Sequence, residues 1–303
     1  MSLRRVRTPA GLRLEALAPD GEWRLHDDAT PLGGQVFDPA WQLAMADRHL
    51  RHTDAVLPFQ PASFRDCMLY EQHAIDASRG FVRRFNSSQH RVVQTFERLT
   101  GRVFPLLRPN ALFYSQPIYY MSNALTFVPT GTPIPIPPYT RALDYELELG
   151  FVLARGLFNA SPDEAEAAIG AFVVLNDLSA RDVQRAEMGS GFGPQKAKHF
   201  ASSLSETAVT ADEVLPRIDS LRGTVSINGK RVSTVSSAGM QHSLGAVLAH
   251  ASRGEQLFPG ELFGTGTLPG GSGMETGHWL RAGDTLTLAV EDIGHIEHRI
   301  IEP

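Results

Sequence analysis

Three carboxylates recur at every second position in one short segment of this 303-residue chain. In Asp144-Tyr-Glu146-Leu-Glu148, a strand would place all three acidic side chains on one face, because side chains alternate across a strand. Like charges held so close repel each other, and a bound cation removes that cost. Carboxylate oxygens suit Mg²⁺, Mn²⁺ or Ca²⁺. The segment predicts either a divalent metal site or, alternatively, a solvated strand face.

A second polar segment, 176–184, directly follows the apolar run 171–175. Polar residues at the end of a strand are well placed to project into a site. Asp177 can add an oxygen ligand, and Arg181 can hold a carboxylate with its planar guanidinium. The alternative is a helix N-terminus capped by Asn176 or Asp177, with Arg181 on the helix surface.

Lysine is rare in this chain: only three of its 28 basic residues are lysines. Two of them, Lys196 and Lys198, stand two residues apart. A lysine beside a metal-carboxylate cluster can stabilise a developing oxyanion. The alternative is that both lysines belong to a basic surface loop.

The segment 66–76 contains a histidine between two aspartates. As part of one helix, Asp66 and His73 would share a face and Asp76 would be a neighbour of His73. A carboxylate next to an imidazole fixes its tautomer and raises its basicity. We expect Asp76 to be that partner and Glu275 to be the alternative, unless His73 is purely structural.

Periodicity and turn signals indicate the elements that must position these residues. Apolar spacing predicts helices over 64–81 and 89–98 and strands over 145–153 and 171–175. The later part of the chain has the alternating pattern of a β-rich structure.

Two local motifs predict a further helix and a hairpin, and the N-terminal region predicts a separate subdomain. Ser161-Pro-Asp-Glu164 predicts a capped short helix, and Asn228-Gly229 predicts a hairpin turn. We expect 1–60 to form a small N-terminal subdomain, with a helix over 38–51, ahead of a catalytic domain over 61–303.

Composition narrows the classes of function. The net charge is −5, which argues against a general nucleic-acid binder, and 42% apolar with 20% charged residues is typical of a globular protein. The single cysteine, Cys67, excludes an internal disulfide or a cysteine-based zinc cluster. No apolar run approaches the ~18 residues of a membrane span, and no apolar signal segment follows the basic N-terminus. We therefore expect a cytoplasmic protein.

At these residues the chain resembles the fumarylacetoacetate hydrolase family. The resemblance covers roughly 63–303, and its segments keep the family's order and spacing. The matching segments are Asp144-Tyr-Glu146-Leu-Glu148, 174–184, Lys198-His-Phe-Ala-Ser202, Gly264-Thr-Gly-Thr267 and Arg281-Ala-Gly-Asp284-Thr-Leu. The resemblance implies a β-rich α+β fold, a mixed β-roll or sandwich around a metal site, assembled as a homodimer.

The resemblance also implies roles for individual residues. His73 would be the general base and Lys198 would stabilise an anionic intermediate. The implied metal ligands are Asp66, Glu146, Glu148 and Asp177. The implied substrate-binding residues are Tyr120, Arg181, Gln184 and Thr267.

The chain departs from the fumarylacetoacetate-cleaving enzymes at two places. Those enzymes have a glutamate in the late glycine-rich loop that orients the catalytic histidine, and here Ser272 or a neighbour stands at that place. Met68 stands where they have a substrate-contacting tyrosine. Fumarylacetoacetate itself is therefore doubtful as the substrate.

The expected function is hydrolysis of a C–C bond in a 1,3-dicarbonyl compound, an acylpyruvate or a fumarylacetoacetate-like molecule, with Mg²⁺, Mn²⁺ or Ca²⁺ as cofactor. His73 would activate water, and the metal and Lys198 would hold the resulting enolate. The alternatives are a 2-oxo acid decarboxylase, isomerase or hydratase of the same family, or a member that only binds a ligand. The expected partner is a small oxo acid or diketone, with neither nucleic acid nor membrane involved.

Overall fold

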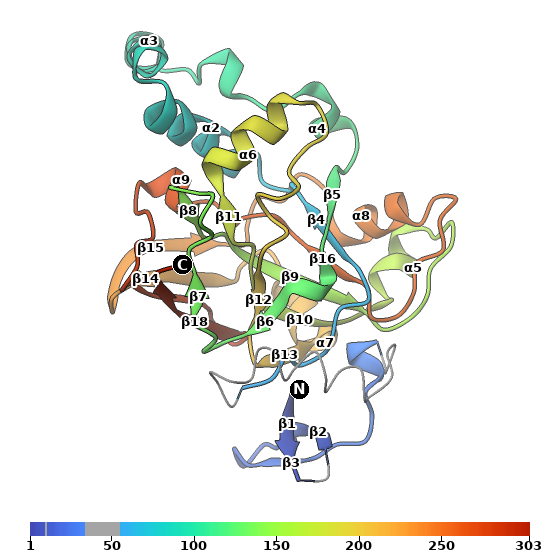
Figure 1. Ribbon diagram of the computed structural model, residues 1–303. Coiled ribbons are helices and arrows are strands. Elements are labelled where there is room, and N and C mark those ends of the chain that lie inside the picture. Colours follow the sequence, from blue (N-terminus) through green and yellow to red (C-terminus); the bar gives the residue numbers. More distant parts are fainter. Residues whose placement is uncertain (10, 34–54) are drawn as a thin grey trace.

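The computed structural model describes residues 1–9, 11–33 and 55–303 (Figure 1). Within these residues the strands form sheets of eleven, five and two strands, and helices of four to fifteen residues lie between them in the sequence. The predicted β-rich α+β fold is confirmed. No helix of the described residues is long and apolar enough to cross a membrane.

The eleven-stranded sheet contains the strands that carry most of the candidate residues. Its main path runs β3-β2-β1-β13-β10-β9-β16-β4-β5, with β12 and β6 beside it. The bounds are β1 Ser2–Thr8, β2 Gly11–Leu17, β3 Trp23–Leu25, β4 Phe64–Cys67, β5 Tyr119–Ser122, β6 Phe127–Pro129, β9 Leu147–Leu153, β10 Ile169–Asn176, β12 Ser202–Leu204, β13 Thr207–Thr210 and β16 Leu262–Gly264.

The central strands β9 and β10 are buried on both faces, which explains their nearly continuous apolar sequence. Their alternate side chains enter different cores. Phe151 and Phe172 join one apolar cluster, whereas Val152 and Val173 join the cluster on the other face. Phe151 also stacks on Phe263 of β16, with ring centroids 5.5 Å apart. The middle of the sheet is therefore a rigid platform for the polar residues at its end.

The five-stranded sheet has the order β15-β14-β17-β18-β7, and the two-stranded sheet joins β8 and β11. The predicted hairpin at Asn228-Gly229 connects β14 and β15, and both turn residues have positive φ. The bounds are β7 Ile134–Pro135, β8 Leu143–Asp144, β11 Ser179–Ala180, β14 Arg222–Ile227, β15 Lys230–Ser236, β17 Thr285–Val290 and β18 Gly294–Ile301.

Helices α2, α3, α4 and α6 gather at one end of the molecule, opposite the strands β1–β3 (Figure 1). The helix predicted over 89–98 corresponds to α3, and the predicted capping box at Ser161 begins α5. The bounds are α2 Glu71–Phe85, α3 Ser87–Thr100, α4 Ala111–Ser115, α5 Pro162–Glu166, α6 Arg181–Gly189, α7 Ala211–Val214, α8 Leu244–Ala251 and α9 Gly273–Thr276; four short 3₁₀ turns are Thr30–Leu32, Pro105–Leu107, Ala124–Thr126 and Leu215–Arg217.

The single helix predicted over 64–81 is wrong. Phe64–Cys67 forms β4, which pairs with β16 on one side and β5 on the other, and α2 begins only at Glu71. Asp66 therefore lies on a strand rather than on the helix of His73. The predicted end of this helix at residue 81 is also wrong, because α2 continues to Phe85.

The N-terminal strands extend the large sheet. Residues Ser2–Thr8 form β1, which pairs antiparallel with β13, and β2 and β3 follow outward from it. The helix expected over 38–51 lies outside the described residues. The domain division at residue 60 stays a prediction.

Candidate metal and catalytic site

Three carboxylates from separate parts of the large sheet meet at one point. Asp66 comes from β4, Glu148 from β9, and Asp177 from the residue after β10, and all three are buried. One oxygen of each carboxylate lies within 4.8 Å of the others. Strand β16 runs between β9 and β4, and its Gly264 leaves the room they need. A Cβ at Gly264 would lie 2.6 Å from Asp66 Oδ1 and 2.7 Å from Glu148 Oε2.

This triad fits a divalent cation. Both oxygens of Glu148 and Oδ1 of Asp66 are buried and accept no hydrogen bond from the described residues. Burial raises the pKa of both groups well above their usual range, and the neighbouring carboxylates raise it further. Buried carboxylates with unused oxygens are the ligands that Mg²⁺, Mn²⁺ and Ca²⁺ prefer.

Glu146 stands apart from the triad and lies between two cations. Its Oε1 accepts a hydrogen bond from Arg181 Nη2 at 2.6 Å, and its Oε2 contacts Lys198 Nζ. Burial would raise the pKa of Glu146, but Arg181 and Lys198 outweigh burial and hold the pKa far below its usual range. Glu146 is thus an ion-pair partner here, and its implied role as a metal ligand stays a prediction.

Lys198 is buried, and its ammonium joins two carboxylates. Its Nζ lies 2.6 Å from Asp177 Oδ2 and also contacts Glu146. Burial would lower the pKa of Lys198, but Asp177 and Glu146 raise it above its ordinary value, so the side chain stays protonated. The Tyr120 hydroxyl donates to the same oxygen of Asp177. Lys196, by contrast, is exposed.

All three guanidinium nitrogens of Arg181 donate hydrogen bonds to side chains of this site. Its Nε donates to Asp144 Oδ2 at 2.8 Å and its Nη1 donates to Gln184 Oε1 at 3.0 Å, in addition to the bond to Glu146. The guanidinium therefore positions protein groups. The implied substrate contacts of Arg181, Gln184 and Thr267 stay predictions; Thr267 is buried in the loop after β16.

Asp144 has a positioning role that the sequence reasoning missed. Its carboxylate accepts hydrogen bonds from the backbone amides of Gly273 at 2.8 Å and Met274 at 2.9 Å, at the start of α9. The sequence did point to this residue, because the pattern of an acidic residue at every second position, which groups Glu146 with Glu148, also includes Asp144. What the alternation does not reveal is that Asp144 binds backbone amides.

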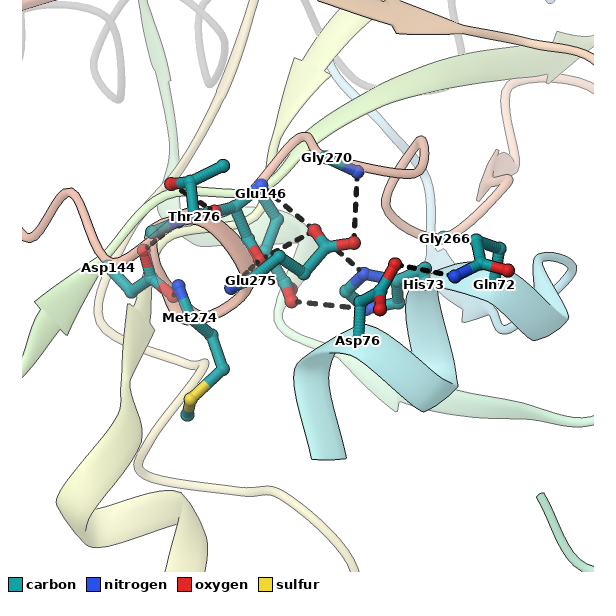
Figure 2. Close-up of polar contacts among 12 residues, drawn as sticks. Gln72, His73, Asp76, Asp144, Glu146, Gly266, Gly270, Met274, Glu275 and Thr276 are labelled. Atoms are coloured by element: carbon teal, nitrogen blue, oxygen red, sulfur yellow. Dashed lines mark hydrogen bonds and ion pairs between the residues drawn. The ribbon is translucent and has the colours of Figure 1, made fainter. Parts of the chain in front are cut away.

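His73 lies buried in the first turn of α2 and faces Glu275 (Figure 2). Its Nδ1 is 3.1 Å from Glu275 Oε2, and its Nε2 is 3.9 Å from Glu146 Oε1. Burial would lower the pKa of His73, but the contact with Glu275 and the charge of Glu146 together outweigh burial and raise it. An imidazole held at Nδ1 by a carboxylate presents Nε2 as the atom that can accept a proton.

The expected contact between His73 and Asp76 is wrong. Asp76 Oδ2 instead accepts a hydrogen bond from Gln72 Nε2 at 2.7 Å, and its other oxygen pairs with Arg79. The helical neighbours Gln72 and Arg79, four residues before and three residues after Asp76, thus engage its carboxylate. Glu275, the alternative, is the carboxylate that contacts the histidine.

Glu275 is held in place by a capping box at the start of α9. Its Oε2 accepts from the Ser272 amide at 3.1 Å and the Ser272 hydroxyl at 2.8 Å, and its Oε1 accepts from the Gly270 amide at 2.9 Å. The apparent departure at Ser272 is therefore corrected: Ser272 is the N-cap, and Glu275 supplies the carboxylate to His73. Ser-x-x-Glu is a capping signature that could have identified this pair.

Comparisons with known proteins point to one family. The sequence pattern described as "Fumarylacetoacetate (FAA) hydrolase C-terminal" matches residues 101–301. A mitochondrial oxaloacetate tautomerase of Homo sapiens is 28% identical over 56% of this chain and 76% of its own length. A 2,4-didehydro-3-deoxy-L-rhamnonate hydrolase of Sphingomonas is 28% identical over 62% of this chain and 66% of its own length.

Solved structures share the fold. A fumarylacetoacetate hydrolase from Exiguobacterium antarcticum covers 100% of both chains, with a TM-score of 0.68 and 19% identity. A fumarylpyruvate hydrolase from Pseudomonas aeruginosa, in complex with Mn²⁺ and pyruvate, covers 83% of this chain and 93% of its own, with a TM-score of 0.58 and 18% identity. At these identities the likeness establishes the fold.

Proposed function

Because the chain belongs to the fumarylacetoacetate hydrolase family, we propose that it is a divalent-metal-dependent enzyme that hydrolyses a C–C bond of a 1,3-dicarbonyl substrate such as an acylpyruvate. The observation that carries the proposal is the buried pair of His73 and Glu275, with Nε2 of the histidine near Glu146. A histidine oriented by a carboxylate is the arrangement that general-base activation of water requires.

The metal would be held by Asp66, Glu148 and Asp177. Two cations, Arg181 and Lys198, lie among a larger number of buried carboxylates, namely Asp66, Asp144, Glu146, Glu148 and Asp177. Negative charge would be in excess once these carboxylates are ionised. A divalent cation offsets that excess and, when bound, polarises substrate carbonyl oxygens as a Lewis acid.

His73 would act as the general base. Nδ1 would keep its proton and donate it as a hydrogen bond to Glu275, which lies 3.1 Å away, so the lone pair of Nε2 would be free to remove a proton from water. The distance from Nε2 to Glu146 Oε1, 3.9 Å, is too long for a direct hydrogen bond, so Nε2 is not committed to another protein group there. The raised pKa of His73 makes it a stronger base than an ordinary imidazole.

Lys198 would stabilise the charge that appears when the C–C bond breaks. The water oxygen bonds to one carbonyl carbon, and the electron pair of the cleaved bond moves onto the carbonyl oxygen of the departing fragment. The ammonium of Lys198 is a fixed positive charge suited to that oxygen. The proton taken by His73 then returns to the carbon of the fragment, which balances the reaction.

A second candidate is keto–enol tautomerisation of a 2-oxo acid such as oxaloacetate. The relatives named as oxaloacetate tautomerases favour it. This reaction needs the same base and the same stabilised anion, because His73 would move a proton between carbon and oxygen, but it requires no attack by water. Decarboxylation, isomerisation or hydration of a 2-oxo acid stays open on the same grounds.

A substrate panel decides between these reactions. Metal-depleted protein is assayed with acylpyruvates and with enol-oxaloacetate, with and without Mg²⁺, Mn²⁺ or Ca²⁺. Hydrolysis yields two separated products, whereas tautomerisation changes the enol absorbance without cleavage. Hydrolysis that depends on metal and is lost in His73→Gln supports the proposal. Tautomerisation alone would favour the second candidate, and metal binding without any turnover would favour a ligand-binding protein.

We also propose that the protein works as a homodimer in the cytoplasm. Light scattering on the purified chain measures its mass in solution directly. A monomer mass across the working concentration range would reject the dimer.

A further inference from the structure

Helix α2 contacts α9 along a single face. His73, Gly80 and Arg83 are spaced at i, i+7 and i+10, so all three point to the same side of the helix. His73 meets the Glu275 carboxylate, and a Cβ at Gly80 would lie 1.8 Å from the Met274 carbonyl oxygen. Arg83 Nη2 donates to the carbonyl oxygens of Met274 at 3.3 Å and of Glu275 at 3.1 Å.

The short helix α9 depends on contacts from outside itself. It has four residues, so few of its backbone groups find partners within the helix. At its start, the amides of Gly273 and Met274 are bound by Asp144. At its end, the carbonyls of Met274 and Glu275 receive the guanidinium of Arg83. A cation at this end also interacts favourably with the helix dipole.

We propose that Arg83 is a positioning residue for Glu275: it caps the C-terminal end of α9 and ties that helix to α2, so that the carboxylate stays against His73. Because the capping box joins the Glu275 carboxylate to the α9 backbone, movement of that backbone moves the carboxylate. The catalytic part of this inference rests on the proposed function, whereas the structural part does not.

The test compares Arg83→Met with Arg84→Met. Both residues are exposed and adjacent on α2, but the Arg84 guanidinium lies 5.0 Å from the Trp279 ring rather than on the carbonyls of α9. Hydrogen exchange is measured at Thr276 and Gly277, whose amides bond within the helix to Ser272 and Gly273. We expect about tenfold faster exchange in Arg83→Met and no change in Arg84→Met. Equal exchange in both variants would overturn the proposal.

Kinetics then tests whether Arg83 acts through Glu275. We expect Arg83→Met to lower kcat about tenfold with little change in KM. Arg83→Lys, which keeps a donor and the charge, should recover part of the loss. In a Glu275→Gln background Arg83→Met should cost nothing further. Additive losses would reject the role. If the protein turns over none of the substrates, the proposed function fails, while the exchange experiment still decides the structural part.

Discussion

Gly264 offers the most direct test of the metal site, because it has no catalytic group of its own. Gly264→Ala would place a methyl group within 2.7 Å of the Asp66 and Glu148 oxygens. We expect Mn²⁺ affinity, measured by titration calorimetry, to fall about tenfold or more while the circular dichroism spectrum is unchanged. Glu148→Ala should abolish binding altogether. Unchanged affinity in both variants would mean that the metal does not sit between these carboxylates.

The two neighbouring lysines form a natural matched pair. Lys198→Met should lower kcat about 10²-fold or more, because the buried ammonium beside Asp177 and Glu146 is lost. Lys196→Met should cost little, since its Nζ lies over the Tyr139 ring at 5.4 Å on the surface. Steady-state kinetics at saturating metal measures both. Small and equal losses would indicate that neither lysine takes part in the reaction.

Residue types and spacing located most of the candidate site, but not the contacts that organise it. Alternation found Glu146 and Glu148, and the scarcity of lysine drew attention to Lys198. The partner of His73 could not be derived from helical spacing, because Glu275 is about 200 positions away and reaches it only through the packing of α9 on α2. Gly264 has no side chain that could indicate a role, so only the strand order β9-β16-β4 reveals its place beside the carboxylates.

The docking of α2 on α9 depends on the absence of a side chain at Gly80. Gly80→Ala would put Cβ 1.8 Å from the Met274 carbonyl, so the two helices must separate. We expect the free energy of unfolding to fall by about 2 kcal/mol and the activity to fall with it. Gly189→Ala is the control, because it also adds a methyl group to a helical glycine but meets nothing within 4 Å. Chemical denaturation measures both, and equal stability would contradict the tight contact.

Elements were predictable where local signals and tertiary environment agreed. The capping box at Ser161 and the hairpin at Asn228-Gly229 are determined by backbone geometry within a few residues, and both appear as expected. Phe64–Cys67, with the sequence Phe-Arg-Asp-Cys, was misassigned because four residues are too few to distinguish the period of a helix from that of a strand. Its neighbours β16 and β5 are distant in sequence, and pairing with them decides the outcome.

A buried histidine connects the two larger sheets. We expect its titration to make the stability of the fold depend on pH. His298 lies on β18 of the five-stranded sheet, and its Nε2 is 2.8 Å from Ser203 Oγ on β12 of the large sheet. Its Nδ1 is 2.7 Å from the Thr132 carbonyl oxygen. Because the carbonyl can only accept, Nδ1 carries the proton and Nε2 accepts from the serine, so the neutral ring satisfies both contacts.

Protonation of His298 should therefore weaken the fold in acid. Burial lowers its pKa to about 4 from an ordinary value of 6.5, so between these pH values the unfolded chain binds a proton that the folded chain does not. The contribution of this group to stability is complete above about pH 6.5 and falls as the pH decreases towards 4, by about 3 kcal/mol.

Urea unfolding of wild type and His298→Asn between pH 7.5 and 4.5 isolates the contribution, because the other titrating groups are common to both proteins. The variant should be less stable at pH 7.5 but lose less on acidification. The control is His295→Asn, an exposed change on the same strand, which should keep the wild-type slope of unfolding free energy against pH. If His298→Asn also kept the wild-type slope, the acid sensitivity would belong to other groups.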